Sequence, residues 1–320
     1  MAEAEGGLVG LDEIRAAHDR IRPHVVRTPL VAMADDAVLL KAESLQPVGS
    51  FKLRGAINTM LVLGDEERRR GVVAHSSGNH AIAVAHAGAV LGIPVTVVMP
   101  SDAPAIKRER TVALGARVEV VGPASDERAA RAAELAAAEG LTAVEPYDSR
   151  AVLAATATIA LEILEDLALR GLDGSPVIYV PVSGGGLAGG VATGAKLLDA
   201  RVRIVAVEPE VAADYAASRR AGARVSFTPE QMARTAADGL RVQQVGALPW
   251  PHLQAHVDDA VTVTEAEVRD AAARTWTETG LVAEPSGAVS IAAALAARAG
   301  GAAGSLVAVL TGANTDLPPG

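Results

Sequence analysis

The chain has 320 residues, of which 50% are hydrophobic and 21% are charged; its formal net charge is -9 at pH 7 and it has no cysteine. This composition supports a large folded core, and it excludes disulfides, thiolate metal sites and a cysteine nucleophile. The acidic balance argues against broad contact with nucleic acid or with an anionic membrane. The expected partner is therefore a small molecule.

Short runs rich in Val and Ile alternate along the chain with longer, Ala-rich helical patterns. Strands separated by helices predict right-handed βαβ units, and near-continuous apolar strands indicate a sheet covered on both faces. The expected fold class is α/β, with mostly parallel, open twisted sheets flanked by helices. The clearest expected strands are 38–43, 72–75, 95–99, 117–121, 177–182, 202–208 and 305–311, and the clearest expected helices are 82–91, 126–139, 187–198 and 265–278.

No linker rich in Gly, Ser or Pro divides the chain. The best candidate boundaries are the charged turn 65–71 and the stretch 146–150. We therefore expect a small domain, residues 71–148, inserted into a large domain made from 1–70 and 149–320.

The longest apolar stretch, 81–100, resembles a membrane span by average hydropathy. His86, Gly92 and Pro94 divide it into a helix, a turn and a strand. The acidic N-terminus lacks the basic and apolar regions of a secretory signal. Together with the absence of cysteine, these features predict a soluble protein of the cytoplasm, not a membrane protein.

A glycine-rich turn, Ser183–Gly186, lies between the expected strand 177–182 and a helix that begins near Leu187. Backbone N–H groups in such a turn can converge on an anion at the positive end of the helix. The window also fits the G-x-G-x-x-G fingerprint of dinucleotide binding, with Glu208 about 20 residues further on. A tight turn for helix–strand packing is a third interpretation, and this window alone does not decide between the three.

Lys52 lies between Phe51 and Leu53 near the start of an expected helix. An amine in apolar surroundings has a lowered pKa and is available as a nucleophile. A single lysine on a helix is usually just solvated. A catalytic role for Lys52 is therefore favoured only by a complementary cluster elsewhere in the chain.

That cluster is Ser76-Ser77-Gly78-Asn79-His80, which follows the expected strand 72–75 and opens a helix. Its hydroxyls, amide and free N–H groups form a compact receptor for a small carboxylate, although an ordinary helix N-cap needs one such residue. With Lys52 and the turn Ser183–Gly186, the chain holds the parts of a pyridoxal phosphate site: a Schiff-base amine, carboxylate donors and a phosphate cradle.

From Arg27-Thr28-Pro29-Leu30 to Thr311-Gly312-Ala313-Asn314, the sequence resembles the serine/threonine dehydratases and serine racemases. These belong to the fold type II, tryptophan synthase β-like pyridoxal phosphate enzymes. The resemblance implies a two-lobed fold and an ammonia-lyase that eliminates water from L-threonine, L-serine or a related β-hydroxy amino acid, giving a 2-oxo acid and ammonia. A serine racemase, or a bifunctional racemase and dehydratase, is the alternative. An NAD-dependent oxidoreductase and an amino-acid-binding protein without turnover are more remote ones.

The resemblance also implies roles for individual residues. Lys52 would form the Schiff base, Phe51 would pack on the cofactor ring, Asn79 would contact the ring hydroxyl, and Thr311 would face the pyridine nitrogen. Ser77 would be a second catalytic residue, opposite the lysine as in the racemases. The implied cofactor-binding set is Phe51, Lys52, Asn79, Gly184, Gly185, Gly186, Leu187 and Thr311, and the implied substrate-binding set is Ser76, Ser77, Gly78, Asn79 and His80.

A cation site is implied by Glu208-Pro-Glu-Val-Ala-Ala-Asp214, which is similar to a metal-binding segment of the family. Glu208, Asp214 and the carbonyl of Ala212 would be the ligands, and hard oxygen ligands suit Mg²⁺ or Ca²⁺. Two carboxylates near a helix start are more often solvated, so only the resemblance favours a metal. The family also implies a homodimer.

The chain departs from the family pattern near the expected substrate pocket. It has Ala155-Thr156-Ala157-Thr158 where Gly-Gln-Gly-Thr is usual, Tyr147 where asparagine is common, and Ala313 where glycine is usual. These changes leave the cofactor residues intact. They leave open which β-hydroxy amino acid the pocket accepts.

Overall fold

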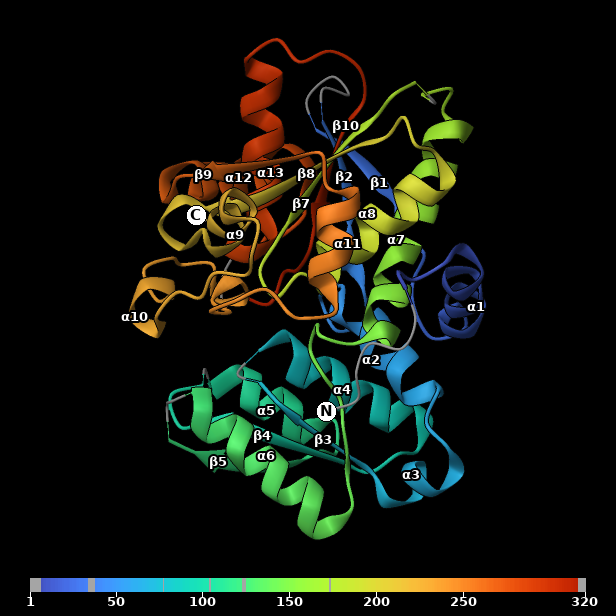
Figure 1. Cartoon of the computed structure of the whole chain (residues 1–320), viewed down its shortest axis with the longest axis vertical. Helices are drawn as coiled ribbons and strands as arrows, with labels where there is room; N and C mark the ends of the chain where they lie inside the picture. Colours follow the sequence, from blue (N-terminus) through green and yellow to red (C-terminus); the bar gives the residue numbers. More distant parts are fainter. Residues whose placement is uncertain are drawn as a thin grey trace.

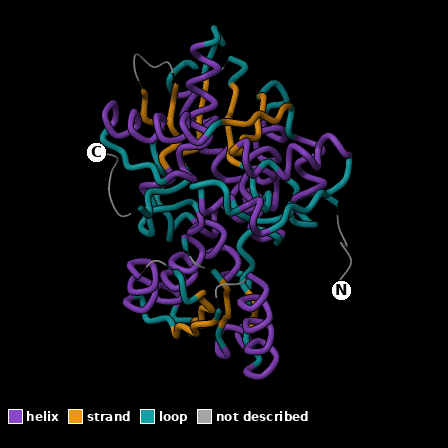
Figure 2. The backbone as a smooth tube through the Cα atoms, turned by 90° about the vertical axis from the view of Figure 1, so that its left-hand side faces the viewer, coloured by secondary structure: helices purple, strands orange, loops and turns teal. Residues whose placement is uncertain are grey.

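The computed structural model describes residues 7–33, 38–76, 78–103, 105–122, 125–172 and 174–315. Its strands form two separate sheets, which occupy the upper and lower lobes in Figures 1 and 2. The larger sheet has the order β1-β2-β10-β7-β8-β9. Its strands are β1 (Leu30–Met33), β2 (Val38–Ala42), β7 (Val177–Pro181), β8 (Arg203–Pro209), β9 (Asp259–Val263) and β10 (Leu306–Leu310).

The smaller sheet is formed by one continuous part of the chain, which lies between the strands that the larger sheet takes from either side. Its order is β5-β4-β3-β6. All described strand pairs are parallel except β1 with β2, which confirms the prediction of mostly parallel α/β sheets. Its strands are β3 (Val72–His75), β4 (Val95–Pro100), β5 (Arg117–Val121) and β6 (Thr142–Ala143).

Helices lie on both faces of each sheet (Figure 2). None in the described part of the chain is long and apolar enough to cross a membrane. The α-helices are α1 (Leu11–Ile21), α2 (Lys52–Leu61), α3 (Asp65–Arg70), α4 (Asn79–Leu91), α5 (Ala105–Ala113), α6 (Ser125–Glu139), α7 (Arg150–Leu169), α8 (Gly186–Leu198), α9 (Asp214–Ala221), α10 (Pro229–Met232), α11 (Pro249–His256), α12 (Glu265–Thr279) and α13 (Pro285–Ala299), and the 3₁₀ helices are η1 (Glu43–Leu45), η2 (Glu210–Ala212) and η3 (Asp238–Leu240).

Each central strand of the larger sheet contributes to two cores, because successive side chains of a strand point to opposite faces. Leu39 packs in the core that contains residues of α7 and α8, whereas the next residue, Leu40, packs in the core that contains residues of α12 and α13. Val307 and Ala308 of β10 divide in the same way. A fully buried side chain of this kind stabilises the fold by about 1.5–3 kcal/mol, so both faces hold the sheet rigid at its carboxyl edge.

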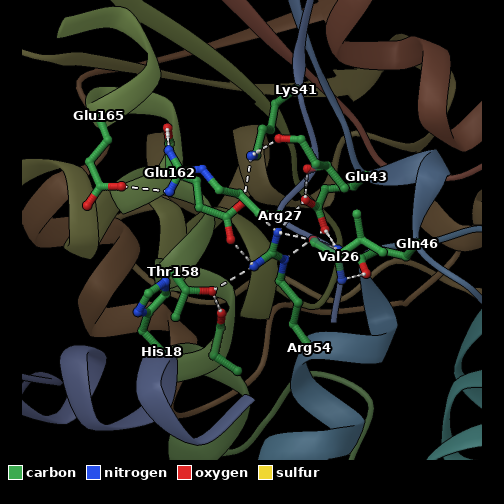
Figure 3. A network of polar contacts seen from close by, with 12 residues as sticks. His18, Val26, Arg27, Lys41, Glu43, Gln46, Arg54, Thr158, Glu162 and Glu165 are labelled. Atoms are coloured by element: carbon green, nitrogen blue, oxygen red, sulfur yellow. Dashed lines mark hydrogen bonds and ion pairs between the residues drawn. The ribbon is translucent and has the colours of Figure 1, made fainter. Parts of the chain in front are cut away.

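Beneath α2 lies a buried ion cluster, formed by Lys41 of β2, Glu43 of η1, Arg54 of α2 and Glu162 of α7 (Figure 3). The Arg54 guanidinium donates to Glu43 Oε1 at 2.7 Å and to Glu162 Oε1 at 2.7 Å, and Lys41 Nζ donates to Glu162 Oε2 at 2.6 Å. Two cations therefore balance two carboxylates out of contact with water. Burial opposes the charged form of Arg54, but the attraction of the two carboxylates raises its pKa above the ordinary value.

The cluster fixes the first turn of α2 relative to the larger sheet. Arg54 lies two residues after Lys52, and its planar guanidinium binds both carboxylates through paired hydrogen bonds, a geometry that lysine cannot reproduce. The backbone of Lys52 is thereby tied to β2 and to α7.

Replacing Arg54 by Met keeps most of the side-chain volume but leaves Glu43 and Glu162 buried with one cation between them. Breaking such a buried arrangement costs about 3–5 kcal/mol, and the loss is expected in the free energy of unfolding measured by urea titration. Arg69→Ala is the control, because Arg69 pairs with Glu66 on the exposed surface of α3 and is expected to contribute less than about 1 kcal/mol. Equal losses in the two variants would contradict a special role for the cluster.

Candidate active site

Lys52 is the first residue of α2, with Phe51 at the N-cap. The backbone N–H of Phe51 donates to the carbonyl of Thr311 at 3.0 Å, so the start of α2 is held at the carboxyl end of β10. Lys52 Nζ donates to the carbonyl of Pro146 at 2.6 Å and lies 5.0 Å from the centre of the Phe51 ring. Burial lowers the pKa of Lys52 to about 8, because a medium poor in water disfavours the ammonium form.

A small cavity lies beside this amine. Burial, followed by the charge of Asp148, raises the pKa of the Glu145 carboxyl at its edge. Burial and nearby carboxylates raise the pKa of the Tyr147 hydroxyl to about 12, so Tyr147 stays protonated near neutral pH. The cavity is lined by Phe51, Lys52, Gly55, Ala56, His80, Glu145, Pro146, Val152 and Thr156.

The glycine turn follows β7 and leads into α8. Gly185 has a φ of +89°, in the left-handed region that favours glycine. A Cβ on Gly184 would lie 2.3 Å from Cγ of Tyr147, and one on Gly186 would lie 2.7 Å from the Tyr147 carbonyl oxygen, so only glycine fits at either position. The N–H groups of 184–187 have no backbone acceptor in the described chain, and at the start of a helix they are suited to bind an anion.

The loop Ser76–His80, which the sequence predicts to bind a small carboxylate, joins β3 to α4. Ser76 Oγ accepts a hydrogen bond from the N–H of Gly78 at 3.1 Å, and Asn79 begins α4. His80 is buried, and burial together with the charge of Lys52 lowers its pKa to about 3. The neutral ring donates from Nε2 to the carbonyl of Val144 at 2.8 Å, so that nitrogen is already occupied. Ser77 lies outside the described residues.

Asn79 makes two hydrogen bonds to residues far away in sequence. Its Nδ2 donates to Glu284 Oε1 at 2.6 Å, and its Oδ1 accepts from Asn314 Nδ2 at 2.7 Å. Glu284 is the N-cap residue of α13, but its side chain makes no capping bond and points to Asn79 instead. Glu284 Oε2 is buried and meets no donor within the described chain. Burial and the charge of Asp238 raise the pKa of Glu284 to about 7.

Two polar side chains of the larger lobe, those of Thr311 and Asp238, lie near Asn79 and Glu284. Thr311 is buried directly after β10, with its hydroxyl 3.4 Å from the Ser286 carbonyl. Asp238, in η3, accepts from Lys107 Nζ at 2.8 Å and from Ser286 Oγ at 3.2 Å. Lys107 belongs to α5, so this ion pair links the two lobes.

The expected cation ligands lie at the carboxyl end of β8. Glu208 accepts hydrogen bonds from the N–H groups of Tyr215 and Ala216 at 2.9 and 2.8 Å. Both oxygens of Asp214 are buried and make no well-formed hydrogen bond in the described chain, and the nearby backbone N–H groups of Asp214 and Val245 only partly offset the effect of burial on its pKa. Burial raises the pKa of Glu208 to about 8, with a further contribution from Asp214, and burial raises that of Asp214 to about 7. Described residues contain no group of three or more His, Cys, Asp or Glu side chains that could hold a metal, so a cation here needs the Ala212 carbonyl and water as well.

The position of Glu208 also bears on the dinucleotide interpretation. Its carboxylate is occupied by backbone N–H groups of α9 and is 1% exposed, so it is not available to bind a ribose. The glycine turn is left without the acidic residue that the fingerprint needs.

Several residues of the site were not identified from the sequence. Arg110, Lys107 and Glu145 lie in ordinary charged segments, and no local pattern marks them. Arg110 donates to Asn314 Oδ1 at 2.6 Å across the gap between the lobes. The pairing of Glu284 with Asn79 joins residues 205 positions apart, a distance over which spacing carries no signal.

These residues fit pyridoxal phosphate. Lys52 supplies an amine with a lowered pKa, the N–H groups of 184–187 supply donors that have no backbone acceptor in the described chain, and Asn79 keeps a second N–H for a ring oxygen. Glu284 Oε2 is a further polar atom with no partner in the described protein.

Comparisons with known proteins agree with this chemistry. Residues 21–312 match the family described as pyridoxal-phosphate dependent enzyme. The chain is 38% identical to serine racemase of Arabidopsis thaliana, over 88% of this chain and 84% of that protein, and 38% identical to L-threonine ammonia-lyase of Thermotoga maritima, over 90% and 71%. The structure of maize serine racemase matches with a TM-score of 0.90 at 35% identity, over 97% of this chain and 95% of that chain.

The match covers both sheets and the segments that carry Lys52, the glycine turn and Asn79. It contradicts an NAD-dependent oxidoreductase and confirms the predicted cofactor and fold. The chain belongs to the pyridoxal-phosphate dependent enzyme family, in its fold type II branch of ammonia-lyases and racemases.

Proposed function

We propose that the protein is a dehydratase for a β-hydroxy amino acid, with L-threonine, L-serine or a close relative as substrate and a 2-oxo acid and ammonia as products. The observation that carries the proposal is the buried amine of Lys52. Its pKa of about 8 lies near neutral pH, and it donates to the Pro146 carbonyl beside a cavity that His80 also lines. The similarity to L-threonine ammonia-lyase supports the same reaction.

The polar contacts to the cofactor are assigned to groups that can still make a hydrogen bond. The N–H groups from Gly184 to Leu187 would hold the phosphate, and the free N–H of Asn79 would meet the ring hydroxyl. Phe51 would pack on the ring, and the Thr311 hydroxyl would face the pyridine nitrogen. Bound through Lys52, the cofactor supplies an electron-withdrawing ring that stabilises negative charge at the substrate α-carbon.

The substrate carboxylate would bind at the start of α4, where Ser76 and Asn79 lie at the positive end of the helix, and we propose that Ser77 contributes to the same site. Gly78 leaves room for this close approach. His80 would act through position, because its Nε2 is used by Val144 and its ring is neutral.

Lys52 Nζ, free again once the substrate amine has taken its place, would take the α-proton, since a neutral amine near its pKa is an effective general base. The β-hydroxyl then leaves with a proton as water. The remaining enamine takes up water and releases ammonia, so the net change is one β-hydroxy amino acid to one 2-oxo acid and one ammonia. The Thr311 hydroxyl cannot hold a proton on the pyridine nitrogen as a carboxylate would. This moderates charge delocalisation and favours loss of the β-hydroxyl.

Racemisation is the second candidate, because serine racemases are among the similar proteins. It requires a second proton donor on the opposite face of the substrate, and we propose Ser77 for that role. One site can catalyse both reactions, with Lys52 removing the α-proton in each.

We also propose a structural Mg²⁺ or Ca²⁺ bound by Glu208, Asp214 and the Ala212 carbonyl. The support is the pair of unpartnered Asp214 oxygens, since a buried carboxylate without a donor is costly unless a cation or a proton neutralises it.

For the larger organisation, we propose a small domain of residues 71–148 and a large domain of 1–70 and 149–320. The division of the strands between two sheets supports it. A cytoplasmic homodimer is proposed from the family resemblance and the absence of cysteine.

The substrate is tested with purified protein, pyridoxal phosphate and a panel of L- and D-β-hydroxy amino acids, measuring 2-oxo acid and chirality in the same samples. We expect oxo acid from one L-substrate, reduced about 10²–10⁴-fold or more in Lys52→Ala. Lys196→Ala is the control, since Lys196 pairs with Asp258 and lies outside the site. Inverted amino acid without oxo acid would establish the racemase instead.

The lowered pKa of Lys52 is tested by labelling the cofactor-free protein with a small amine-reactive reagent across a pH series. Burial disfavours the ammonium, so half-maximal labelling of Lys52 is expected near pH 8, below the ordinary 10.5. Mass spectrometry of the Lys52 peptide reads out the reaction, and Lys52→Ala identifies the signal. A midpoint near 10.5 would show that the amine is solvated.

The cation is tested by thermal unfolding with and without Ca²⁺ or Mg²⁺ after removal of metal by a chelator. A cation that binds only the folded state stabilises it by about 2.7 kcal/mol at a hundredfold excess over its dissociation constant. Asp214→Asn should abolish the rise in melting temperature. Glu210→Gln, at an exposed carboxylate in the same segment, should retain it. An undiminished rise in Asp214→Asn would refute the assignment.

A further inference from the structure

Four polar side chains form a continuous hydrogen-bonded chain between the lobes. Arg110 of α5 donates to Asn314 Oδ1 at 2.6 Å, Asn314 Nδ2 donates to Asn79 Oδ1 at 2.7 Å, and Asn79 Nδ2 donates to Glu284 Oε1 at 2.6 Å. Arg110 and Asn79 belong to helices next to the smaller sheet, whereas Asn314 and Glu284 flank β10 and α13 of the larger one. We call these four residues the amide relay.

The direction of the relay is fixed at both ends by groups with a single role. A guanidinium has only donors, so Arg110 requires the oxygen of Asn314 to face it. The Asn314 amide then turns its two N–H groups to the carbonyl of Val48, at 2.9 Å, and to Asn79 Oδ1. At the other end, Glu284 Oε1 accepts an N–H of Asn79 whether the carboxyl is ionised or carries a proton on Oε2, the oxygen that has no partner in the described chain.

The Asn79 amide is therefore held in one of its two orientations. Its oxygen is used by Asn314, one N–H is used by Glu284, and one N–H is left over. We propose that the amide relay orients Asn79 so that this remaining N–H faces the ring oxygen of the cofactor, with Arg110, Asn314 and Glu284 as positioning residues. The inference rests on the proposed placement of the cofactor beside Asn79.

The surrounding backbone is built to admit the relay. A Cβ on Gly312 would lie 2.2 Å from Glu284 Oε1 and 3.2 Å from Asn79 Nδ2, so a side chain there would displace the contact. Glu284 is only 2% exposed. The charged groups that act on it from neighbouring elements are Asp238 and Lys107.

The relay also couples cofactor binding to the position of the lobes. Asn79 is oriented from the larger lobe, by Asn314 and Glu284, and Asn314 is oriented from the smaller lobe, by Arg110. Moving the lobes apart would release Asn79 from both partners.

Two variants of Asn314 separate orientation from packing. Asn314→Asp keeps the size of the side chain and can pair with Arg110, but it places an acceptor against Asn79 Oδ1. Either the two oxygens stay opposed, or the Asn79 amide turns over and sets its own oxygen against Glu284 Oε1 and the cofactor ring oxygen, so each outcome disturbs the N–H that faces the cofactor. Asn314→Ala removes the partner without forcing the turn.

We expect Asn314→Asp to weaken cofactor binding roughly ten- to a hundredfold and to shift the visible absorbance of the bound cofactor, because an opposed acceptor is costlier than a missing partner. Asn314→Ala should weaken binding less, by about fivefold at most. The melting temperature reports the accompanying loss of stability, which should be at least as large for Asn314→Asp as for Asn314→Ala, because the aspartate oxygen also opposes the Val48 carbonyl. Cofactor titration, absorbance spectra and thermal unfolding supply the three readouts.

Asn58→Asp is the matched control. Asn58 is also buried, accepts from an arginine, Arg20, and donates to a carbonyl, that of Ala151, but it lies toward the far end of α2 from Lys52. The substitution Asn58→Asp should lower the stability of the fold. It should leave the cofactor spectrum unchanged and the affinity for the cofactor within about threefold of that of the unmodified protein.

A second pair of variants covers the case in which Asn314→Asp does not fold. Glu284→Gln keeps an oxygen for Asn79 and should bind cofactor nearly as the unmodified protein does, whereas Glu284→Ala should lose affinity and shift the spectrum.

Equal or tighter cofactor binding by Asn314→Asp than by Asn314→Ala would overturn the relay while leaving the proposed function intact, as would equal binding by Glu284→Gln and Glu284→Ala. Failure of the unmodified protein to bind pyridoxal phosphate through Lys52 would overturn both.

Discussion

The position of Lys52 depends on a buried arrangement of four charges. Lys41, Glu43, Arg54 and Glu162 come from β2, η1, α2 and α7, and they neutralise one another where water cannot reach them. Each ion would be costly alone, so the elements that carry them must come together in one geometry. That geometry places the first turn of α2 at the carboxyl edge of the larger sheet, where the end of β10 holds Phe51.

The reactive groups collect around that fixed point from both lobes. The glycine turn after β7 and the end of β10 belong to the larger sheet, and the loop after β3 belongs to the smaller one. Carboxyl ends of parallel strands are where ligands bind in α/β folds. The gap between the lobes is crossed by Lys107 with Asp238 and by the amide relay. Cofactor orientation and the closeness of the lobes are therefore properties of the same set of contacts.

Sequence patterns predicted the parts of this structure that depend on local chemistry. Strands 72–75 and 117–121 have the predicted bounds, because Val-rich runs between turn residues are a strong local signal. β9 was not predicted, since four of its five residues are exposed or half-buried and they alternate weakly. β6 is too short to be recognised at two residues.

The residues of the site can likewise be separated into those that a local sequence pattern predicts and those that it does not. Lys52, the turn Ser183–Gly186 and the loop Ser76–His80 each have a recognisable local composition. The family match covers all three. The links between them, such as Asn79 with Glu284 and Arg110 with Asn314, join residues more than 200 positions apart and are created by folding. The ion cluster is similar, because Arg54 and Glu162 look like ordinary charged residues until α2 and α7 meet.

The central claim is that Lys52 carries the cofactor. It is tested most directly by adding pyridoxal phosphate to the purified protein, reducing the imine with borohydride, and locating the modified lysine by mass spectrometry of peptides. The account predicts a single pyridoxyl group on the peptide that contains Lys52. Modification of Lys41, Lys107 or Lys196 instead, or no stable modification at all, would contradict it.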